Sequence, residues 1–134
     1  MFEHMNSLTN AMVVRDTEAM LRFVDAQPHA DASRVGAVGY CMSGPFVMAA
    51  AATLPERIQS IASIHGANLV TDRDDSPHRM APRFRCESYF ACAETDRWAS
   101  PEIVQQLQVA LGTPVRPVPA HATRLTAAAP APRG

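Results

Sequence analysis

The residue of this sequence best suited to chemistry is Cys41, which stands between a short apolar run and a run of helix-forming residues. The apolar run, residues 35–38, is typical of a strand that is covered on both faces. Gly39 and Gly44 carry no side chains, so the backbone around the cysteine can turn sharply. A strand, a tight turn with one nucleophile and a helix form a nucleophile elbow. The pattern therefore predicts that Cys41 is a nucleophile.

Amide groups of the same turn would stabilise the reaction that such a thiol performs. The N–H of Met42 is the expected donor to the oxyanion that forms when a thiolate attacks an ester carbonyl. The positive end of the following helix also favours the thiolate, which is the reactive form of cysteine. Ser43 stands where the elbow pattern has glycine, and its small side chain is compatible with the turn. The alternative interpretation of Cys41 is a buried and inert cysteine.

A catalytic thiol needs a base and a carboxylate that orients it. Asp96 is the candidate carboxylate, and the alternative is that it only caps a loop. His121 is the candidate base, because it follows the cysteine and the aspartate in the chain order that a nucleophile elbow of this kind demands. Other candidates are interpreted as structural or solvated side chains, namely His29, His65 and His78 among the histidines, and Arg83 and Arg85 among groups that could attract a carboxylate.

The elements that position these residues alternate between helix and strand. This order implies parallel strands joined by right-handed crossovers. Ligands bind beyond the carboxyl ends of parallel strands, and Cys41, His65 and Asp96 all fall at that edge. The sequence predicts helices at 8–24, 46–54 and 100–111, strands at 35–38, 59–65 and 87–93, and a polar loop between the last two strands. The apolar face of the first helix is predicted to consist of Leu8, Met12, Ala19, Met20 and Phe23.

Length, charge and cysteine content narrow the class of protein. A length of 134 residues is expected to form one domain, at 1–112. The Pro- and Ala-rich segment at 113–134 is expected to be a poorly ordered tail. The net charge of −1 predicts no nucleic acid partner. No apolar stretch approaches a signal peptide or a membrane span, so no membrane partner is expected. Three cysteines without Cys-x-x-Cys spacing predict reduced thiols in the cytoplasm and no metal site, with Cys86 and Cys92 in the core.

Three motifs resemble one family. Residues 39–44, Gly-Tyr-Cys-Met-Ser-Gly, resemble the Gly-Tyr-Cys-x-Gly-Gly elbow of the dienelactone hydrolases. Residues 93–96, followed by Pro-Glu at 101–102, resemble the acid-bearing loop of that family, and residues 64–69 resemble the strand and turn between the two motifs. The resemblance covers roughly residues 5–112.

The resemblance implies a partial α/β-hydrolase fold, with a parallel sheet of about three strands flanked by helices. It assigns the nucleophile to Cys41 and the acid to Asp96 of a Cys-Asp-His triad. Family members are longer, so their first strands are expected to be missing before residue 1, and their histidine lies in a Pro-Gly-x-x-His-Gly-Phe context that His121 lacks. The C-terminal part of this chain is therefore expected to be altered relative to the family.

The implied activity is cleavage of a small-molecule lactone or ester through a thioester on Cys41, as in the breakdown of aromatic compounds, with no cofactor. The alternative is a catalytically inactive, truncated relative that acts as a binding or redox-sensitive thiol protein. A sheet without its first strands has a free edge, which predicts a homo-oligomer.

Overall fold

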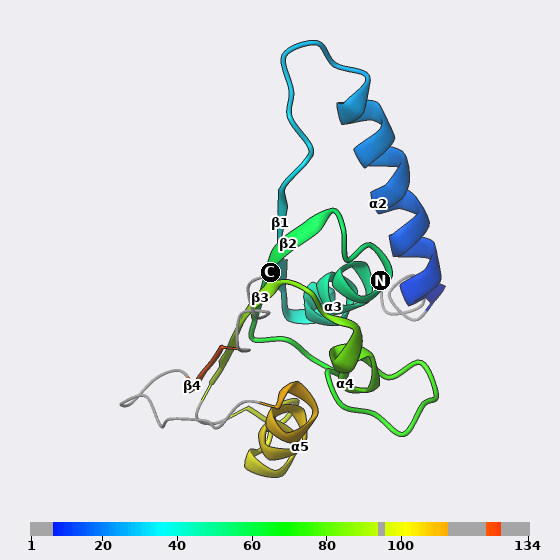
Figure 1. Ribbon diagram of the computed structural model, residues 1–134. Helices are drawn as coiled ribbons and strands as arrows, with labels where there is room; N and C mark the ends of the chain where they lie inside the picture. The colour runs from blue at the N-terminus through cyan, green and yellow to red at the C-terminus, as the bar shows by residue number, and fades with distance from the viewer. Residues whose placement is uncertain (1–6, 94–95, 113–122, 127–134) are drawn as a thin grey trace.

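The computed structural model describes residues 7–93, 96–112 and 123–126, with the last segment described as a strand only. Helices and strands alternate along the chain, as the sequence predicts (Figure 1). The elements are α2 (Asn10–Asp25), β1 (Val35–Tyr40), a 3₁₀ turn (Cys41–Ser43), α3 (Gly44–Thr53), β2 (Ile58–Ile64), α4 (Pro77–Met80), a second 3₁₀ turn (Ala81–Arg83), β3 (Glu87–Cys92), α5 (Pro101–Leu111) and β4 (Thr123–Thr126).

The sheet has the order β1-β2-β3-β4. The first three strands are parallel, which confirms the predicted three-stranded parallel sheet and the α/β class. Their register pairs Tyr40 with Ile64 and Ile64 with Ala91, so the three strands end close to the same level. The structure differs from the sequence prediction at β4, which pairs antiparallel with β3 although it lies in the segment expected to be poorly ordered. These four residues have no apolar pattern that predicts a strand, and they form one because their backbone pairs with the edge of β3.

The core lies between α3 and one face of the sheet. α3 contacts both β1 and β2, and its alanines allow the helix to approach the strands closely. Figure 1 shows α3 between the sheet and α2, which packs on α3. Phe90 and Met48 are fully buried at the centre of this cluster. Cys86 and Cys92 are buried as predicted.

Two predicted surfaces of the fold are wrong. The run at 35–38 was expected to be covered on both faces, but Val38 and Tyr40 of β1 are 59% and 65% exposed. In the described part of the sheet β1 is an edge strand, and α3 covers only one of its faces. The predicted apolar face of α2 is also largely exposed, with Phe23 at 68%, whereas Val14 and Leu21 are the residues that α2 buries.

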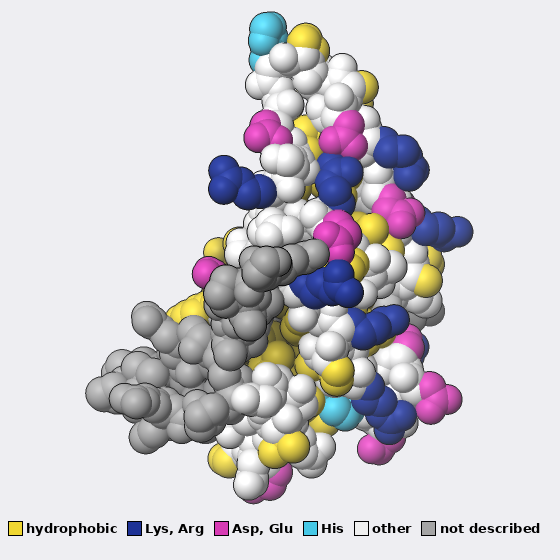
Figure 2. Space-filling view, viewed as in Figure 1, with side chains coloured by type: hydrophobic (Ala, Val, Ile, Leu, Met, Phe, Trp, Pro, Cys, Tyr) yellow, Lys and Arg dark blue, Asp and Glu magenta, His cyan; other side chains and the backbone are white. Residues whose placement is uncertain are grey.

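The segment between β2 and β3 is more ordered than a loop. Pro77 stands at the start of α4, a position where the missing N–H of proline is harmless. The side-chain amide of Asn10 donates a hydrogen bond of 3.1 Å to the carbonyl of Asp75, which ties this segment to the start of α2. On the face drawn in Figure 2, arginine and acidic side chains are interspersed, so the described part of this face has no large patch of one sign.

Candidate active site

Cys41 lies in the sharp turn that joins β1 to α3. Its φ angle is 51°, in the left-handed region that residues with a side chain rarely adopt. Its side chain is exposed, unlike the other two cysteines. A strained, exposed cysteine between a strand and a helix has the geometry of a nucleophile elbow. The alternative interpretation of Cys41 as a buried residue is therefore wrong.

Close backbone approach explains both glycines of the turn. A Cβ atom on Gly44 would lie 2.7 Å from the Cα atom of Gly66, in the turn after β2. A Cβ atom on Gly39 would lie 2.7 Å from the carbonyl carbon of Ser43, across the elbow itself. Real side chains do not tolerate these distances. The elbow can therefore close only because the two positions carry no side chain.

Ser43 closes the elbow with its side chain. Its hydroxyl oxygen accepts a hydrogen bond of 2.7 Å from the N–H of Tyr40 and donates one of 2.8 Å to the carbonyl of the same residue. From the sequence, this serine is expected only to be small enough to replace glycine. The structure gives it a positive role, because it satisfies two backbone groups at the point where β1 stops pairing.

The turn after β2 is tied to the elbow. The N–H of Ala67 donates a hydrogen bond of 3.0 Å to the carbonyl of Cys41, and the N–H of His65 donates one of 2.8 Å to the carbonyl of Ala91. His65 and Asn68 have φ angles of 50° and 58°. Together with Cys41, they are the only non-glycine residues of the described chain with positive φ. Backbone strain is thus concentrated at the carboxyl edge of the sheet.

Asp96 lies just beyond β3, at this same edge. One of its carboxylate oxygens accepts a hydrogen bond of 2.8 Å from the N–H of Trp98, and its carbonyl accepts one of 3.2 Å from the N–H of Ala99. Burial raises the pKa of the Cys92 thiol to about 11, and the negative charge of Asp96 adds to this shift. Asp96 therefore caps a local turn, and no described histidine is hydrogen-bonded to it.

The histidines divide clearly by position. His78 has a structural role, since its Nδ1 atom lies 2.8 Å from the hydroxyl of Ser76, and burial lowers its pKa. His29 is exposed in the segment before β1, at the opposite end of the sheet from the elbow. His65 is exposed directly after β2. His121 lies outside the described residues. The two arginines weighed in the sequence analysis are both exposed, and Arg85 pairs with Glu56 at 2.7 Å.

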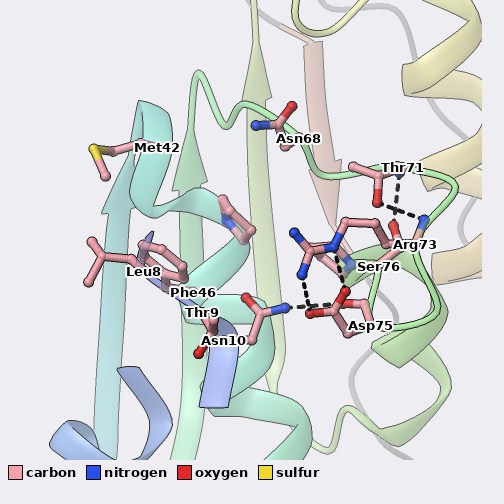
Figure 3. A pocket seen from close by; sticks show the side chains of 12 residues that line it. Leu8, Thr9, Asn10, Met42, Phe46, Asn68, Thr71, Arg73, Asp75 and Ser76 are labelled. Carbon is pink, nitrogen blue, oxygen red and sulfur yellow. Dashed lines mark hydrogen bonds and ion pairs between the residues drawn. The ribbon is translucent and has the colours of Figure 1, made fainter. Parts of the chain in front are cut away.

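The N–H of Met42 belongs to the first turn after β1, where amides have no acceptor within the helix. The side chain of Met42 also lines a cavity of about 170 Å³ that sequence reasoning missed (Figure 3). Pro45 and Phe46 of α3 give this cavity an apolar wall, together with Leu8. The opposite wall comes from the segment after β2 and from the start of α2, and it is polar: Thr9, Asn10, Asn68, Thr71, Arg73, Asp75 and Ser76, with Pro77 beside them.

An ion pair lies within the polar wall of the cavity. The guanidinium of Arg73 bonds both carboxylate oxygens of Asp75, at 2.8 and 2.9 Å, as Figure 3 shows. The hydroxyl of Ser76 accepts a hydrogen bond of 2.8 Å from the N–H of Thr71. The only sequence signal for this wall was the long polar segment itself, because the cavity is assembled from parts far apart in the chain.

Neither a membrane span nor a metal centre emerges from the described parts of the chain. No helix within residues 7–93 and 96–112 has the length and apolar character needed to cross a bilayer. In the same residues no cluster of histidine, cysteine, aspartate and glutamate side chains is arranged to hold a metal ion.

Comparison with known proteins indicates a family and a related fold. The model of the Dienelactone hydrolase family matches residues 1–117. The chain belongs to the dienelactone hydrolase family. A solved structure named m3DLH resembles it in fold, with a TM-score of 0.58 and 22% sequence identity over 76% of this chain. This chain spans only 40% of the length of that structure, and a search of curated proteins found no match.

Proposed function

We propose that this member of the dienelactone hydrolase family is a cysteine hydrolase that cleaves a small-molecule lactone or ester. The observation that carries the proposal is the exposed thiol of Cys41, held at a φ angle of 51° between β1 and α3. Buried cysteines are inert, whereas a substrate can reach the exposed thiol of Cys41. Family membership supports the same assignment.

The proposed reaction proceeds through a thioester. The thiolate of Cys41 attacks the carbonyl carbon, and the carbonyl electron pair moves to the oxygen, which accepts a hydrogen bond from the N–H of Met42. When the tetrahedral intermediate collapses, the carbon–oxygen bond breaks and the leaving oxygen takes a proton from the protonated base. Water, deprotonated by the same base, then cleaves the thioester. The base is a histidine, and chain order predicts His121, with Asp96 as the orienting carboxylate.

The cavity beside the elbow supports a substrate with one apolar and one polar end. Met42 contributes the proposed oxyanion donor and lines the cavity, whereas Cys41 itself does not line it. A group attached to the reacting carbonyl would therefore extend past Met42 into the cavity. Phe46 and Leu8 would contact the apolar part, and Asn68 and Thr71 would face the polar part. A lactone derived from an aromatic ring has this character. The reaction as written needs no cofactor.

Turnover of an activated ester and of an unsaturated lactone tests this function. The full chain is assayed with para-nitrophenyl acetate and with a five-membered unsaturated lactone. Cys41→Ala is expected to abolish both activities. The matched control is Cys92→Ala, which removes a buried thiol and should retain both. Equal rates for the wild type and Cys41→Ala would reject the proposed function.

A second candidate function is a catalytically inactive relative that acts as a binding or redox-sensitive thiol protein. The observation that favours it is the edge and face of β1, which no element of the described chain covers and where Val38 and Tyr40 are exposed beside Cys41. An edge strand without charged side chains invites pairing with a second copy of the chain. Light scattering of the wild type and of Val38→Lys tests this pairing, since a lysine on the edge should shift a dimer to monomer. Rapid alkylation of Cys41 without ester turnover would favour this second function.

The three thiols also bear on where the protein acts. All three cysteines are free in the structure, and the exposed one would be oxidised readily. We therefore propose a reducing compartment, the cytoplasm, as the site of action.

A further inference from the structure

The cavity beside the elbow is linked to Cys41 through two neighbouring stretches of backbone. Met42, the next residue in the chain, lines the cavity, and so does Asn68. Asn68 directly follows Ala67, whose N–H donates a hydrogen bond of 3.0 Å to the carbonyl of Cys41. The elbow and the turn after β2 therefore both lead from the proposed nucleophile to this cavity.

The cavity is large enough for a group about the size of one ring. Its volume is about 170 Å³, and an apolar protein cavity of about 150 Å³ binds benzene. Phe46 and Leu8 provide an apolar wall against which such a group can pack. What else the cavity accepts depends on its polar wall, and above all on the charges of that wall.

Among the described residues, the polar wall carries one charged side chain of each sign. Arg73 and Asp75 both line the cavity, and the guanidinium bonds both carboxylate oxygens, at 2.8 and 2.9 Å (Figure 3). A bidentate contact is the strong form of such a pair. An anionic substrate group would have to separate Arg73 from Asp75 before the guanidinium could bind it. The described wall is therefore neutral toward a substrate, although it contains an arginine.

The segment around this ion pair is also unfavourable to an anion. Residues 72–79 contain three carboxylates and two guanidiniums, so their net charge is −1 when His78 is neutral. Burial lowers the pKa of His78, which keeps this histidine neutral at neutral pH. Arg79 is paired with Asp74 at 3.4 Å, so the second guanidinium is engaged as well. A carboxylate on the substrate would meet net repulsion here instead of a free cation.

The neutral polar groups of the wall are available to a ligand. Asn68 is exposed, and its side-chain amide has no hydrogen bond to another described residue. The hydroxyl oxygen of Thr71 accepts a hydrogen bond of 3.4 Å from the N–H of Arg73, which leaves its O–H free to donate to a ligand. Amides and hydroxyls both donate and accept. They suit an uncharged partner such as a hydroxyl or a carbonyl oxygen.

We propose that the cavity receives the acyl part of an uncharged substrate, and that Asp75 determines this preference because it neutralises Arg73. This inference rests on the proposed hydrolase function and names the substrate class of the same site. The class is esters or lactones whose acyl part carries a hydroxyl or carbonyl group but no carboxylate. Asp75 is a specificity-determining residue that takes no part in the chemical step, and its removal would make Arg73 available to an anion.

The test compares pairs of compounds that differ mainly in charge. The ester pair is mono-para-nitrophenyl glutarate, which carries a carboxylate, and its methyl ester, and the measurement is kcat/KM. The thiol-reagent pair is 3-maleimidopropionic acid and N-ethylmaleimide, and the measurement is the rate of addition to the Cys41 thiol, which needs no hydrolysis. Each neutral-to-anionic ratio is divided by the ratio for 2-mercaptoethanol in place of the protein, which removes differences in intrinsic reactivity.

Three variants of the full chain are measured beside the wild type. Asp75→Asn frees the guanidinium of Arg73 and keeps the backbone carbonyl of residue 75 that Asn10 binds. Arg73→Gln is the reciprocal change, since it leaves the carboxylate of Asp75 without this partner. Asp74→Asn is the matched control, because it removes a neighbouring carboxylate that does not line the cavity.

The wild type is expected to prefer the neutral member of both pairs. Asp75→Asn should lower both ratios by about three- to fivefold, a modest change because the side chains of this ion pair are 70% and 43% exposed. Arg73→Gln should raise both ratios, and Asp74→Asn should change them by less than about twofold. In about 1 M salt, where the screening length is about 3 Å, the proteins should converge.

Three outcomes would overturn this inference. They are a wild type without preference for the neutral compounds, unchanged ratios in Asp75→Asn, and an equal shift in Asp74→Asn, which would reflect total charge alone. The two pairs separate this inference from the proposed function. If no protein turns over the esters but the maleimide ratios shift as expected, the hydrolase function fails and the charge preference of the cavity stands. If turnover depends on Cys41 but no ratio shifts, only the role of Asp75 fails.

Discussion

Replacing Ser43 with alanine isolates the contribution of one side chain to the elbow. The hydroxyl of Ser43 bonds the N–H of Tyr40 at 2.7 Å and its carbonyl at 2.8 Å. Both bonds close the turn that holds Cys41 at a left-handed φ angle. Ser43→Ala removes both without changing the backbone or adding volume. The variant should therefore weaken the elbow while leaving the apolar core intact.

The magnitude follows from where these bonds lie. A typical protein hydrogen bond contributes about 0.5–1.5 kcal/mol net, because water replaces it in the unfolded chain. Tyr40 is 65% exposed, so water can reach its backbone groups in the variant, and the lower half of that range applies to each bond. Ser43→Ala should therefore lower the free energy of unfolding by about 1–2 kcal/mol, which is a five- to thirty-fold change in the folding equilibrium.

Urea denaturation of the variant and of a matched control measures this change. Ser60→Ala is the control, because Ser60 is an exposed serine of β2 whose side chain has no hydrogen bond to another described residue. The midpoint should fall in Ser43→Ala at an unchanged slope, and Ser60→Ala should stay close to the wild type. Equal midpoints for the two variants would refute the role given to Ser43, since the hydrogen bonds would then contribute nothing measurable.

Three other perturbations have outcomes that the structure defines. Gly44→Ala should destabilise the fold by about 1–3 kcal/mol, measured by thermal unfolding, because its Cβ would lie 2.5 Å from the hydroxyl of a buried serine on β2. Iodoacetamide should label only Cys41 in the native protein, as read by mass spectrometry, because burial raises the pKa of Cys86 and Cys92 to about 11 and shields both. Burial also lowers the pKa of His78 from its ordinary value of about 6.5, so the unfolded chain binds more protons there and stability falls as the pH drops below that value. The urea midpoint should therefore fall less on acidification in His78→Asn than in the wild type. An equal fall in both proteins would mean that other groups cause the loss of stability.

The elbow could be predicted from the sequence because everything it requires is contiguous. The apolar strand, the two glycines and the helix formers stand within about twenty residues, and each acts on its neighbours through the backbone. Gly39 and Gly44 were read as freedom to turn. In the structure, a Cβ atom at either position would lie less than 3 Å from a backbone atom. Both positions therefore need glycine for close approach of the backbone as well as for flexibility.

The surfaces of α2 and of β1 could not be predicted in the same way. α2 carries apolar residues on more than one side, and periodicity alone does not tell which side meets α3. The structure buries Val14 and Leu21 and leaves Phe23 exposed. The cavity beside Met42 was missed for a related reason, since its walls come from α2, α3 and the segment after β2, which only the folded chain brings together.

The base of the proposed reaction shows most clearly what chain order leaves open. The three residues at the carboxyl edge are the same for any order of the strands, and the sequence predicted all three there. With β1 in the middle of the sheet, His65 and Asp96 would lie on opposite sides of the thiol, and the acid could not orient that histidine. With β3 in the middle, the acid itself would lie beside the thiol. In the observed order β2 lies in the middle, so the elbow and the acid are separated by one strand. How the three residues lie relative to one another therefore depends on strand order, a property of the sheet that no local motif encodes.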